Sequence, residues 1–215
     1  MTHTLHRQGE YESLSDDFVV LAMAAAGIND AEATDANRAF LDLALAHGAD
    51  EVNMGTMETG SIYQVEFERI REEAVGGRIL HAVFADFDDL ESFLVELAEL
   101  ELGLSVVVTG LFDRTEAVCD RVGELADADP LPEPHTARWA AGIEGDTDRL
   151  PEEWVLELST MCGHGMVAFD LVREMREAVA TGKMDVSQAA ERIAEPCACG
   201  IVNTERAERL LREAM

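Results

Sequence analysis

Apolar positions along the first half of the chain follow two alternating patterns. Short continuous apolar runs, such as the one at 18–23, are typical of buried strands. Between them, apolar residues recur every three or four positions, as at Leu90, Phe93 and Leu97, which indicates amphipathic helices. The expected strands cover residues 18–23, 51–55, 78–84 and 104–108, and the expected helices cover 35–47, 88–100 and 113–125. Residues 63–75 carry both patterns and are assigned to neither.

The order of these elements indicates a fold class. Strand, helix, strand, strand, helix and strand follow one another across 17–110, which matches the split βαβ arrangement of ferredoxin-like domains. A doubly wound α/β sheet with further crossovers is the alternative. Residues 135–145 are a candidate for one more strand, after a proline-broken linker at 127–134. We therefore expect an α+β protein with a ferredoxin-like α/β sandwich at 15–145, preceded by a disordered N-terminus at 1–14.

Helical signals dominate from residue 150 onward. Pro151 suits a first helical turn, and Asp185 with Gln188 forms a capping-box pattern at the start of a later helix. Pro196 ends that helix, and Asn203 is placed to cap the last one. The expected helices cover 150–162, 166–180, 185–195 and 203–215. Together they form a helical module at 150–215.

The chain is strongly acidic along nearly its whole length. It has 44 Asp and Glu residues against 16 Lys and Arg residues, which gives a formal net charge of −28. Because the acidic residues are spread out, we interpret them as the solvated surface of a cytoplasmic protein from a salt-adapted, halophilic organism. Nucleic-acid binding is disfavoured because clusters of basic residues are missing. No stretch approaches the roughly 20 apolar residues of a membrane span and no signal peptide is recognisable, so we expect no membrane partner.

Three of the four cysteines lie in two short segments, Cys162-Gly163-His164-Gly165 and Cys197-Ala198-Cys199-Gly200. In the cytoplasm cysteines are normally reduced, so these are better interpreted as metal ligands than as disulfides. Three thiolates and one imidazole, from Cys162, His164, Cys197 and Cys199, suit a tetrahedral zinc ion or an iron–sulfur cluster. Both segments fall at expected helix boundaries, where folding brings them together. The fourth cysteine, Cys119, is expected in the core of the protein.

The sequence does not decide between the two metals. The Cys₃His ligand set is common in structural zinc sites, but the C-x-C spacing is closer than the usual two to four intervening residues. Apolar and glycine residues around both segments favour an iron–sulfur cluster. Both cofactors therefore remain open at this point, as do a thiol-based redox or nucleophilic site and cysteines that are merely buried small residues.

Four further residues are candidates for a ligand pocket. Asp113 and Arg114 follow an expected strand, and the carboxyl ends of strands commonly hold ligands in α/β sheets. His135 lies in an expected loop after a proline. His81 lies among apolar residues of an expected strand, where a hydrogen-bonded core histidine is the plainer interpretation.

The metal site carries the functional interpretation. The first hypothesis is a cytoplasmic iron–sulfur protein that acts in electron transfer or as an oxidoreductase. The second is a structural-zinc protein whose α/β domain binds a small molecule or forms a homodimer as a regulatory module. The third is a metalloenzyme whose metal keeps an open position, with His164 as the residue that does not coordinate. The expected partner is accordingly a redox protein or a small molecule, and the sequence leaves open whether the chain is an enzyme.

Overall fold

The protein combines one β-sheet with many short helices. The structure is a computed structural model that describes residues 7–126, 132–136 and 146–215. In these residues a six-stranded sheet accompanies ten α-helices, a mixed α/β architecture. The strands are β1 (Phe18–Met23), β2 (Asn53–Thr56), β3 (Gly60–Ser61), β4 (Leu80–Phe84), β5 (Ser105–Gly110) and β6 (Glu133–Thr136). Their order in the sheet is β3-β2-β4-β1-β5-β6, and every neighbouring pair is antiparallel except β5 and β6.

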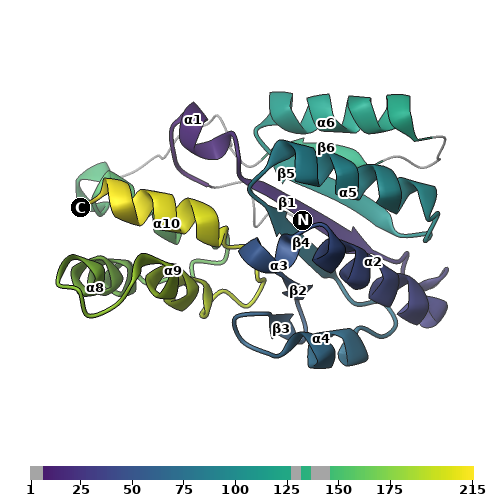
Figure 1. Cartoon of the computed structure of the whole chain (residues 1–215), viewed down its shortest axis with the longest axis horizontal. Helices are drawn as coiled ribbons and strands as arrows, with labels where there is room; N and C mark the ends of the chain where they lie inside the picture. Colours follow the sequence, from purple (N-terminus) through teal and green to yellow (C-terminus); the bar gives the residue numbers. More distant parts are fainter. Residues whose placement is uncertain (1–6, 127–131, 137–145) are drawn as a thin grey trace.

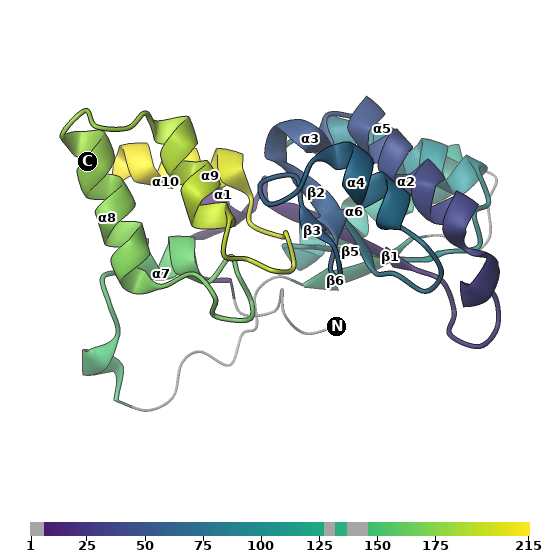
Figure 2. The same cartoon turned by 90° about the horizontal axis from the view of Figure 1, so that it is seen from below.

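One face of the sheet is covered by helices from the first part of the chain (Figure 2). The helices before residue 126 are α1 (Tyr11–Leu14), α2 (Thr34–Ala46), α3 (Ala49–Val52), α4 (Phe67–Glu73), α5 (Phe87–Glu99) and α6 (Phe112–Leu125), with a 3₁₀ turn at Asp30–Glu32. Because side chains alternate along a strand, Phe18, Val20 and Ala22 of β1 all point to this face. They pack against α2, α4, α5 and α6 in one apolar cluster that also contains Phe40 and Phe93.

The C-terminal helices form a second group, on the left of Figure 1 and Figure 2. They are α7 (Glu153–Ser159), α8 (Phe169–Ala180), α9 (Val186–Ala194) and α10 (Thr204–Glu213), after a 3₁₀ turn at Thr147–Arg149. These helices share an apolar cluster with Val19 and Leu21 of β1 and Val83 of β4, whose side chains point to the other face of the sheet. The C-terminal helices and the sheet therefore have a core in common.

The hydrophobic pattern locates most elements correctly. The strands expected at 18–23, 78–84 and 104–108 correspond to β1, β4 and β5, and the helices expected before residue 126 correspond to α2, α5 and α6. The two expected helix caps are also confirmed. Asp185 accepts a hydrogen bond from the backbone of Gln188 in a full capping box, and the Asn203 side chain accepts one from the backbone of Arg206.

The expectation of a disordered N-terminus at 1–14 is wrong for residues 7–14, while residues 1–6 lie outside the described part of the chain. Residues Tyr11–Leu14 form α1, and the side chains of Arg7 and Leu14 are buried. The polar residues of this segment are held by hydrogen bonds to residues near position 160 and beyond position 200, and Arg7 forms an ion pair with Asp17. A local sequence pattern contains no sign of such distant partners.

Two other segments differ from the pattern. A strand was expected at 51–55, but Ala49–Val52 forms the short helix α3 and β2 starts only at Asn53. Gly48 adopts a left-handed backbone with φ 79°, which ends α2 and redirects the chain into α3. The candidate strand at 135–145 starts earlier, as β6, and residues 137–145 lie outside the described residues. None of the helices in the described part is long and apolar enough to cross a membrane.

Candidate functional site

The two ligand segments fold into turns of the same form. In the first, which connects α7 to α8, the backbone N–H of Gly165 donates to the carbonyl of Cys162 at 3.0 Å. In the second, which connects α9 to α10, the N–H of Gly200 donates to the carbonyl of Cys197 at 2.9 Å. Both glycines have left-handed backbones, with φ 65° and 60°. Cys162 therefore corresponds to Cys197, the first residue of each turn.

Corresponding side chains of the two turns lie against one another. The third residues are His164 and Cys199, and the Nδ1 atom of the histidine lies 2.5 Å from the sulfur of the cysteine. The first residues are also paired, because the thiol of Cys162 donates a hydrogen bond to the sulfur of Cys197. A further bond from the thiol of Cys197 to the sulfur of Cys199 joins the two pairs. The structure thus brings all four expected ligands into one chain of contacts.

The three thiols are buried, whereas the histidine side of the site is open. Cys162, Cys197 and Cys199 are 2%, 0% and 3% exposed and belong to the apolar cluster of the C-terminal helices. His164 lies on the exposed outer side of its turn. A bound group would therefore be enclosed by protein on the thiol side and reachable from solvent past the imidazole.

Backbone amides point at the first sulfur of each turn. The amides of His164 and Met166 donate hydrogen bonds to the sulfur of Cys162, and the amide of Ile201 donates to the sulfur of Cys197. Each of these bonds lowers the pKa of the thiol that receives it. Met166 and Ile201 both stand four positions after the cysteine they contact. This shared N–H to sulfur bond favours the thiolate form, which is the form that binds metals.

The pKa values of the three thiols are shifted in different directions. The hydrogen bond from Cys197 lowers the pKa of Cys199, and it outweighs the opposing effect of burial. The pKa of Cys162 is raised because this thiol donates its own proton to Cys197 and is buried. The hydrogen bond with Cys162 lowers the pKa of Cys197. The hydrogen bond with Cys199 and burial act in the opposite direction and together outweigh it, so the pKa of Cys197 is raised. The hydrogen bond from Cys197 therefore favours the thiolate form of Cys199, which lies beside the imidazole of His164.

The side chains of His164 and Cys199 lie closer together than two ligands of one metal ion would. Among residues 7–126, 132–136 and 146–215, no group of three or more His, Cys, Asp and Glu side chains is arranged to hold a metal ion. A tetrahedral zinc ion bonds to sulfur at about 2.3 Å and to nitrogen at about 2.0 Å. It would therefore hold a ligating sulfur and a ligating nitrogen about 3.5 Å apart. The observed distance between His164 Nδ1 and Cys199 Sγ is 2.5 Å. Binding of such an ion would require this pair to open by about 1 Å.

The second turn rests directly on the sheet. A side chain at Gly200 would collide with His81, whose Nε2 atom would lie 2.1 Å from the added Cβ, and with Ser61 of β3 at 2.8 Å. His81 belongs to β4 and is fully buried on the face that carries the C-terminal helices. Two residues after Gly200, the backbone carbonyl of Val202 accepts a hydrogen bond from the side chain of Asn53 at 3.0 Å. Glycine is required at position 200 both by its φ angle and by this contact.

The four residues expected to line a ligand pocket lie in two places. His81 lies beneath the turn at Cys197–Gly200. Asp113 and Arg114 lie in the first turn of α6, where Asp113 accepts a hydrogen bond from the Tyr11 hydroxyl at 2.6 Å and Arg114 stacks over the ring of Phe87 at 4.6 Å. His135 belongs to β6. Its backbone carbonyl accepts a hydrogen bond from the hydroxyl of Thr115, which lies in α6 like Asp113 and Arg114.

Cys119 takes no part in the site. It lies on α6 within the apolar cluster on the opposite face of the sheet. Burial, followed by the charge of Asp120, raises the pKa of its thiol to about 11. Its expected place in the core is confirmed.

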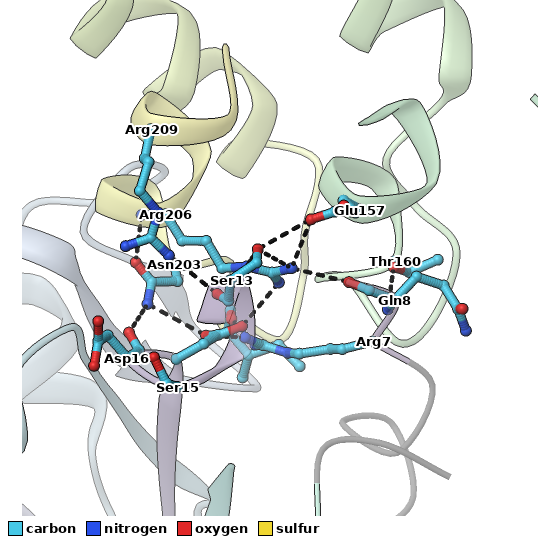
Figure 3. A network of polar contacts seen from close by, with 12 residues as sticks. Arg7, Gln8, Ser13, Ser15, Asp16, Glu157, Thr160, Asn203, Arg206 and Arg209 are labelled. Carbon is cyan, nitrogen blue, oxygen red and sulfur yellow. Dashed lines mark hydrogen bonds and ion pairs between the residues drawn. The ribbon is translucent and has the colours of Figure 1, made fainter. Parts of the chain in front are cut away.

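A buried ionic network beside the site was not expected from the sequence (Figure 3). Asp17, at the start of β1, is bound by the guanidinium groups of Arg7 and Arg206, and also by the side-chain amide of Asn203 at 3.2 Å. Both arginines and the aspartate are 1% exposed. Burial alone raises the pKa of Asp17, but the two arginine charges and the hydrogen bonds from Arg7 and Asn203 together hold it below its usual value. The alternation of apolar and polar residues gave no signal for this network because its members are far apart in sequence.

An apolar groove runs along the outer side of the first turn. Its volume is about 500 Å³. The groove is lined by Leu156, Ser159, Thr160, Cys162, Gly163, Gly165, Val167, Ala168 and Phe169. Cys162 is the only one of the four expected ligands among these residues, so the groove meets the site at this thiol.

Comparison of the chain with protein-family models, with curated proteins and with solved structures finds no match.

Proposed function

We propose that the C-terminal part of the protein is a metal-binding module whose ligands are Cys162, His164, Cys197 and Cys199. The observation that carries this proposal is the pairing of two equivalent turns. Each turn contributes its first and third side chain, and amides of the backbone donate to the first sulfur of each. Three thiols and an imidazole that meet in this way form a ligand set that suits zinc and other thiophilic metals.

The closeness of the four side chains favours one ion over a cluster. In a tetrahedral site of one ion, neighbouring ligand atoms are separated by about 3.5 to 4 Å. An iron–sulfur cluster contains several irons, so its protein ligands stand farther apart. The contact of Cys197 with both other thiols is closer to the first arrangement. We therefore propose a single zinc ion, and the iron–sulfur centre with a role in electron transfer stays a prediction that metal analysis separates from it.

The proposed ion would join the two halves of the helical group. One turn lies between α7 and α8, and the other lies between α9 and α10 and rests on β2, β3 and β4. Metal bonds across these turns would add their free energy to folding, as structural zinc does in small domains. In this proposal the zinc fixes the helices on the sheet, and the protein acts as a binding or regulatory module.

We further propose that the sheet is of the ferredoxin-like type. Two features support this: the order β2-β4-β1-β5, and the antiparallel pairing of each neighbouring pair in that set. Helices α2 and α5 both lie on one face and connect strands that are separated by one other strand. Strands β3 and β6 then extend the two edges.

The setting that we propose is a cytoplasm of high salt content. Four free thiols, three of them in mutual contact, remain reduced in a cytoplasmic environment. A net charge of −28 is tolerated more easily where salt screens the repulsion between acidic side chains.

Metal analysis of the purified protein tests the proposal. The full chain is purified without oxygen in high salt, and its zinc, iron and sulfide are measured with the absorption spectrum. We expect a colourless protein with one zinc per chain, loss of zinc in Cys162→Ser and Cys199→Ser, and full zinc content in the control Cys119→Ser. A brown protein with iron and sulfide would instead support the cluster. A native protein that contains neither metal, and whose thiols at 162, 197 and 199 all react freely, would contradict both.

An enzymatic role is a second candidate because the groove reaches Cys162 and the His164 side is exposed. A catalytic metal keeps one position for water or substrate. Cobalt-substituted protein distinguishes the two roles, because its visible spectrum reports on the number and type of ligands. If added azide changes the spectrum of the unaltered chain, the metal has an open position. A spectrum that responds to azide only in His164→Ala supports a closed, structural site.

A further inference from the structure

Two consecutive residues near the N-terminus form hydrogen bonds beside both ligand turns, to a residue just before the first turn and to a residue just after the second. The backbone N–H of Gln8 donates to the hydroxyl of Thr160 at 2.9 Å, two positions before Cys162. The guanidinium of Arg7 donates to the carbonyl of Ile201, two positions after Cys199. Figure 3 shows Arg7, Gln8 and Thr160 in this arrangement. We call Arg7 and Gln8 the N-terminal strap.

The strap is itself fixed by the buried ionic network. Arg7 binds Asp17 with one nitrogen of its guanidinium while the other nitrogen reaches the ligand turn. The carbonyl of Gln8 accepts from Arg206 at 2.9 Å, and the same arginine binds Asp17 at 3.0 Å. Because a guanidinium is planar and donates in fixed directions, these bonds leave the strap little freedom to shift.

The strap bridges two turns that are separated along the chain by helices α8 and α9. The turn at Cys162–Gly165 and the turn at Cys197–Gly200 belong to different helix pairs. Adjacent Cα atoms of the strap are separated by about 3.8 Å, so a grip on both sides restricts how far the turns can move apart. The turn at Cys197–Gly200 lies against His81 of the sheet, and Asn53 binds the carbonyl of Val202 just after it, whereas nothing in the described structure lies within 4 Å of a Cβ added at Gly165 in the other turn.

We propose that the N-terminal strap positions the metal ligands: Arg7 and Gln8 set the separation of the two turns and so determine how tightly the site holds its metal. This inference rests on the proposed metal-binding function. The strap contacts no ligand atom in the hydrogen bonds described, and acts by holding the segments that carry the ligands. Groups that hydrogen-bond to a metal ligand change metal affinity by about 10- to 100-fold when they are removed, and we expect an effect within the same range for a strap that holds both ligand segments.

Two variants remove the strap's bonds in different ways. Arg7→Met keeps an apolar stem but loses the donors to Asp17 and Ile201. Thr160→Val keeps the shape of the side chain and removes only the hydroxyl that accepts from Gln8, with no change of charge.

Each variant has a matched control elsewhere in the C-terminal helices. Arg209→Met removes an arginine that donates to the carbonyl of Ser13 and touches neither turn. Thr181→Val removes a hydroxyl that, like that of Thr160, donates to the carbonyl four positions earlier in its own helix.

Zinc affinity and cobalt spectra of the full chain test the proposal. Affinity is measured in high salt by competition with a chromophoric chelator, and thermal unfolding of the metal-free proteins is recorded in parallel. We expect both strap variants to bind zinc about 10- to 100-fold more weakly and to shift the cobalt absorption bands, while both controls match the unaltered chain. A merely structural role would lower the unfolding temperature and leave affinity and spectrum unchanged.

The outcomes separate the strap from the metal site itself. If the unaltered chain binds zinc and the strap variants bind it within about twofold as tightly, the strap inference is overturned and the metal site stands. If the unaltered chain binds neither zinc nor cobalt, the proposed function fails and the inference fails with it. Should Arg7→Met not fold, because Asp17 loses a buried partner, Thr160→Val decides the result alone.

Discussion

His164 and Cys199 hold the same position in two turns of the same form, and their side chains are in contact, with 2.5 Å between Nδ1 and Sγ. The pairing continues at the first position, where Cys162 contacts Cys197. Each turn thus places its two candidate ligands on the side that faces the other turn.

Gly200 is expected to tolerate a side chain less well than its counterpart Gly165. Both glycines have left-handed backbones, so Ala at either position costs about 1 kcal/mol of stability from φ alone. At position 200 the added Cβ also meets His81 and Ser61, whereas nothing lies within 4 Å at position 165. We therefore expect Gly200→Ala to destabilise the protein by a further 1 to 3 kcal/mol, roughly the cost of an overpacked core site. Urea unfolding of both variants measures the difference, and equal losses would contradict the close contact.

Asp17 is expected to contribute stability that disappears in acid. Its folded pKa lies below the usual value, so its contribution is complete above the unfolded pKa of about 4 and is lost as the pH falls through the lower, folded pKa. Asp17→Asn removes the charge that both buried arginines share. We expect this change to cost about 3 to 5 kcal/mol near pH 7, as does loss of one partner from a buried ion pair.

The pH dependence of that loss is the decisive measurement. The gap between Asp17→Asn and the unaltered protein, taken from denaturant unfolding in high salt, should narrow below about pH 4, where the carboxylate is protonated in the unfolded chain before it is protonated in the native protein. Asp42→Asn is the matched control, because Asp42 also binds an arginine, Arg71, at 2.6 Å but on the exposed surface. This control is expected to cost about 1 kcal/mol or less. A gap for position 17 that stays constant from pH 7 to pH 3 would contradict the assigned role.

The two capping residues are expected to differ in importance. The Asp185 side chain only caps α9 on the surface, so Asp185→Ala should cost about 1 kcal/mol. Asn203 caps α10 and also donates to Asp17 and to the backbone of Asp16, both at 3.2 Å. Because Asn203→Ala leaves these buried acceptors with fewer donors, we expect it to cost about 2 to 4 kcal/mol. Thermal unfolding of the two variants side by side checks the order.

Removal of salt is expected to destabilise the whole protein. The screening length grows from about 3 Å at 1 M salt to about 30 Å at 0.01 M, so the repulsion within a net charge of −28 then acts across the molecule. We expect the unfolding temperature to fall steadily as NaCl is diluted and to recover with KCl at the same ionic strength. Recovery with an uncharged osmolyte alone, at low ionic strength, would argue against screening as the cause.

Much of the fold can be predicted from the local spacing of apolar residues in the sequence. The apolar run at 18–23 becomes β1, and the stripe of Leu90, Phe93 and Leu97 becomes the buried side of α5. The periods of two and 3.6 residues are properties of strands and helices themselves, so they appear in the sequence before any packing. By contrast, the pattern predicts a strand at 51–55, but Ala49–Val52 forms the helix α3. In a segment this short, packing against the rest of the protein determines the secondary structure more than the local pattern does.

The candidate site divides in the same way. The two segments share the pattern of Cys, any residue, His or Cys, then Gly. This pattern identifies four candidate ligands, and its glycine is compatible with a turn in each segment. That Cys162 meets Cys197, and His164 meets Cys199, depends on the placement of four helices on one sheet. The close contact of Gly200 with His81 likewise appears only in the folded chain.

The sequence by itself determined the helices, most strands, the acidic surface and the identity of the candidate ligands, because each depends on residue types at short spacing. Only the tertiary structure decided which ligands face one another and which residues hold them. Arg7 and Ile201 are 194 positions apart, and Arg206 and Asp17 are 189 apart. Partners at such separations leave no local pattern, because the bonds between them exist only after the apolar faces of strands and helices have brought the backbone together.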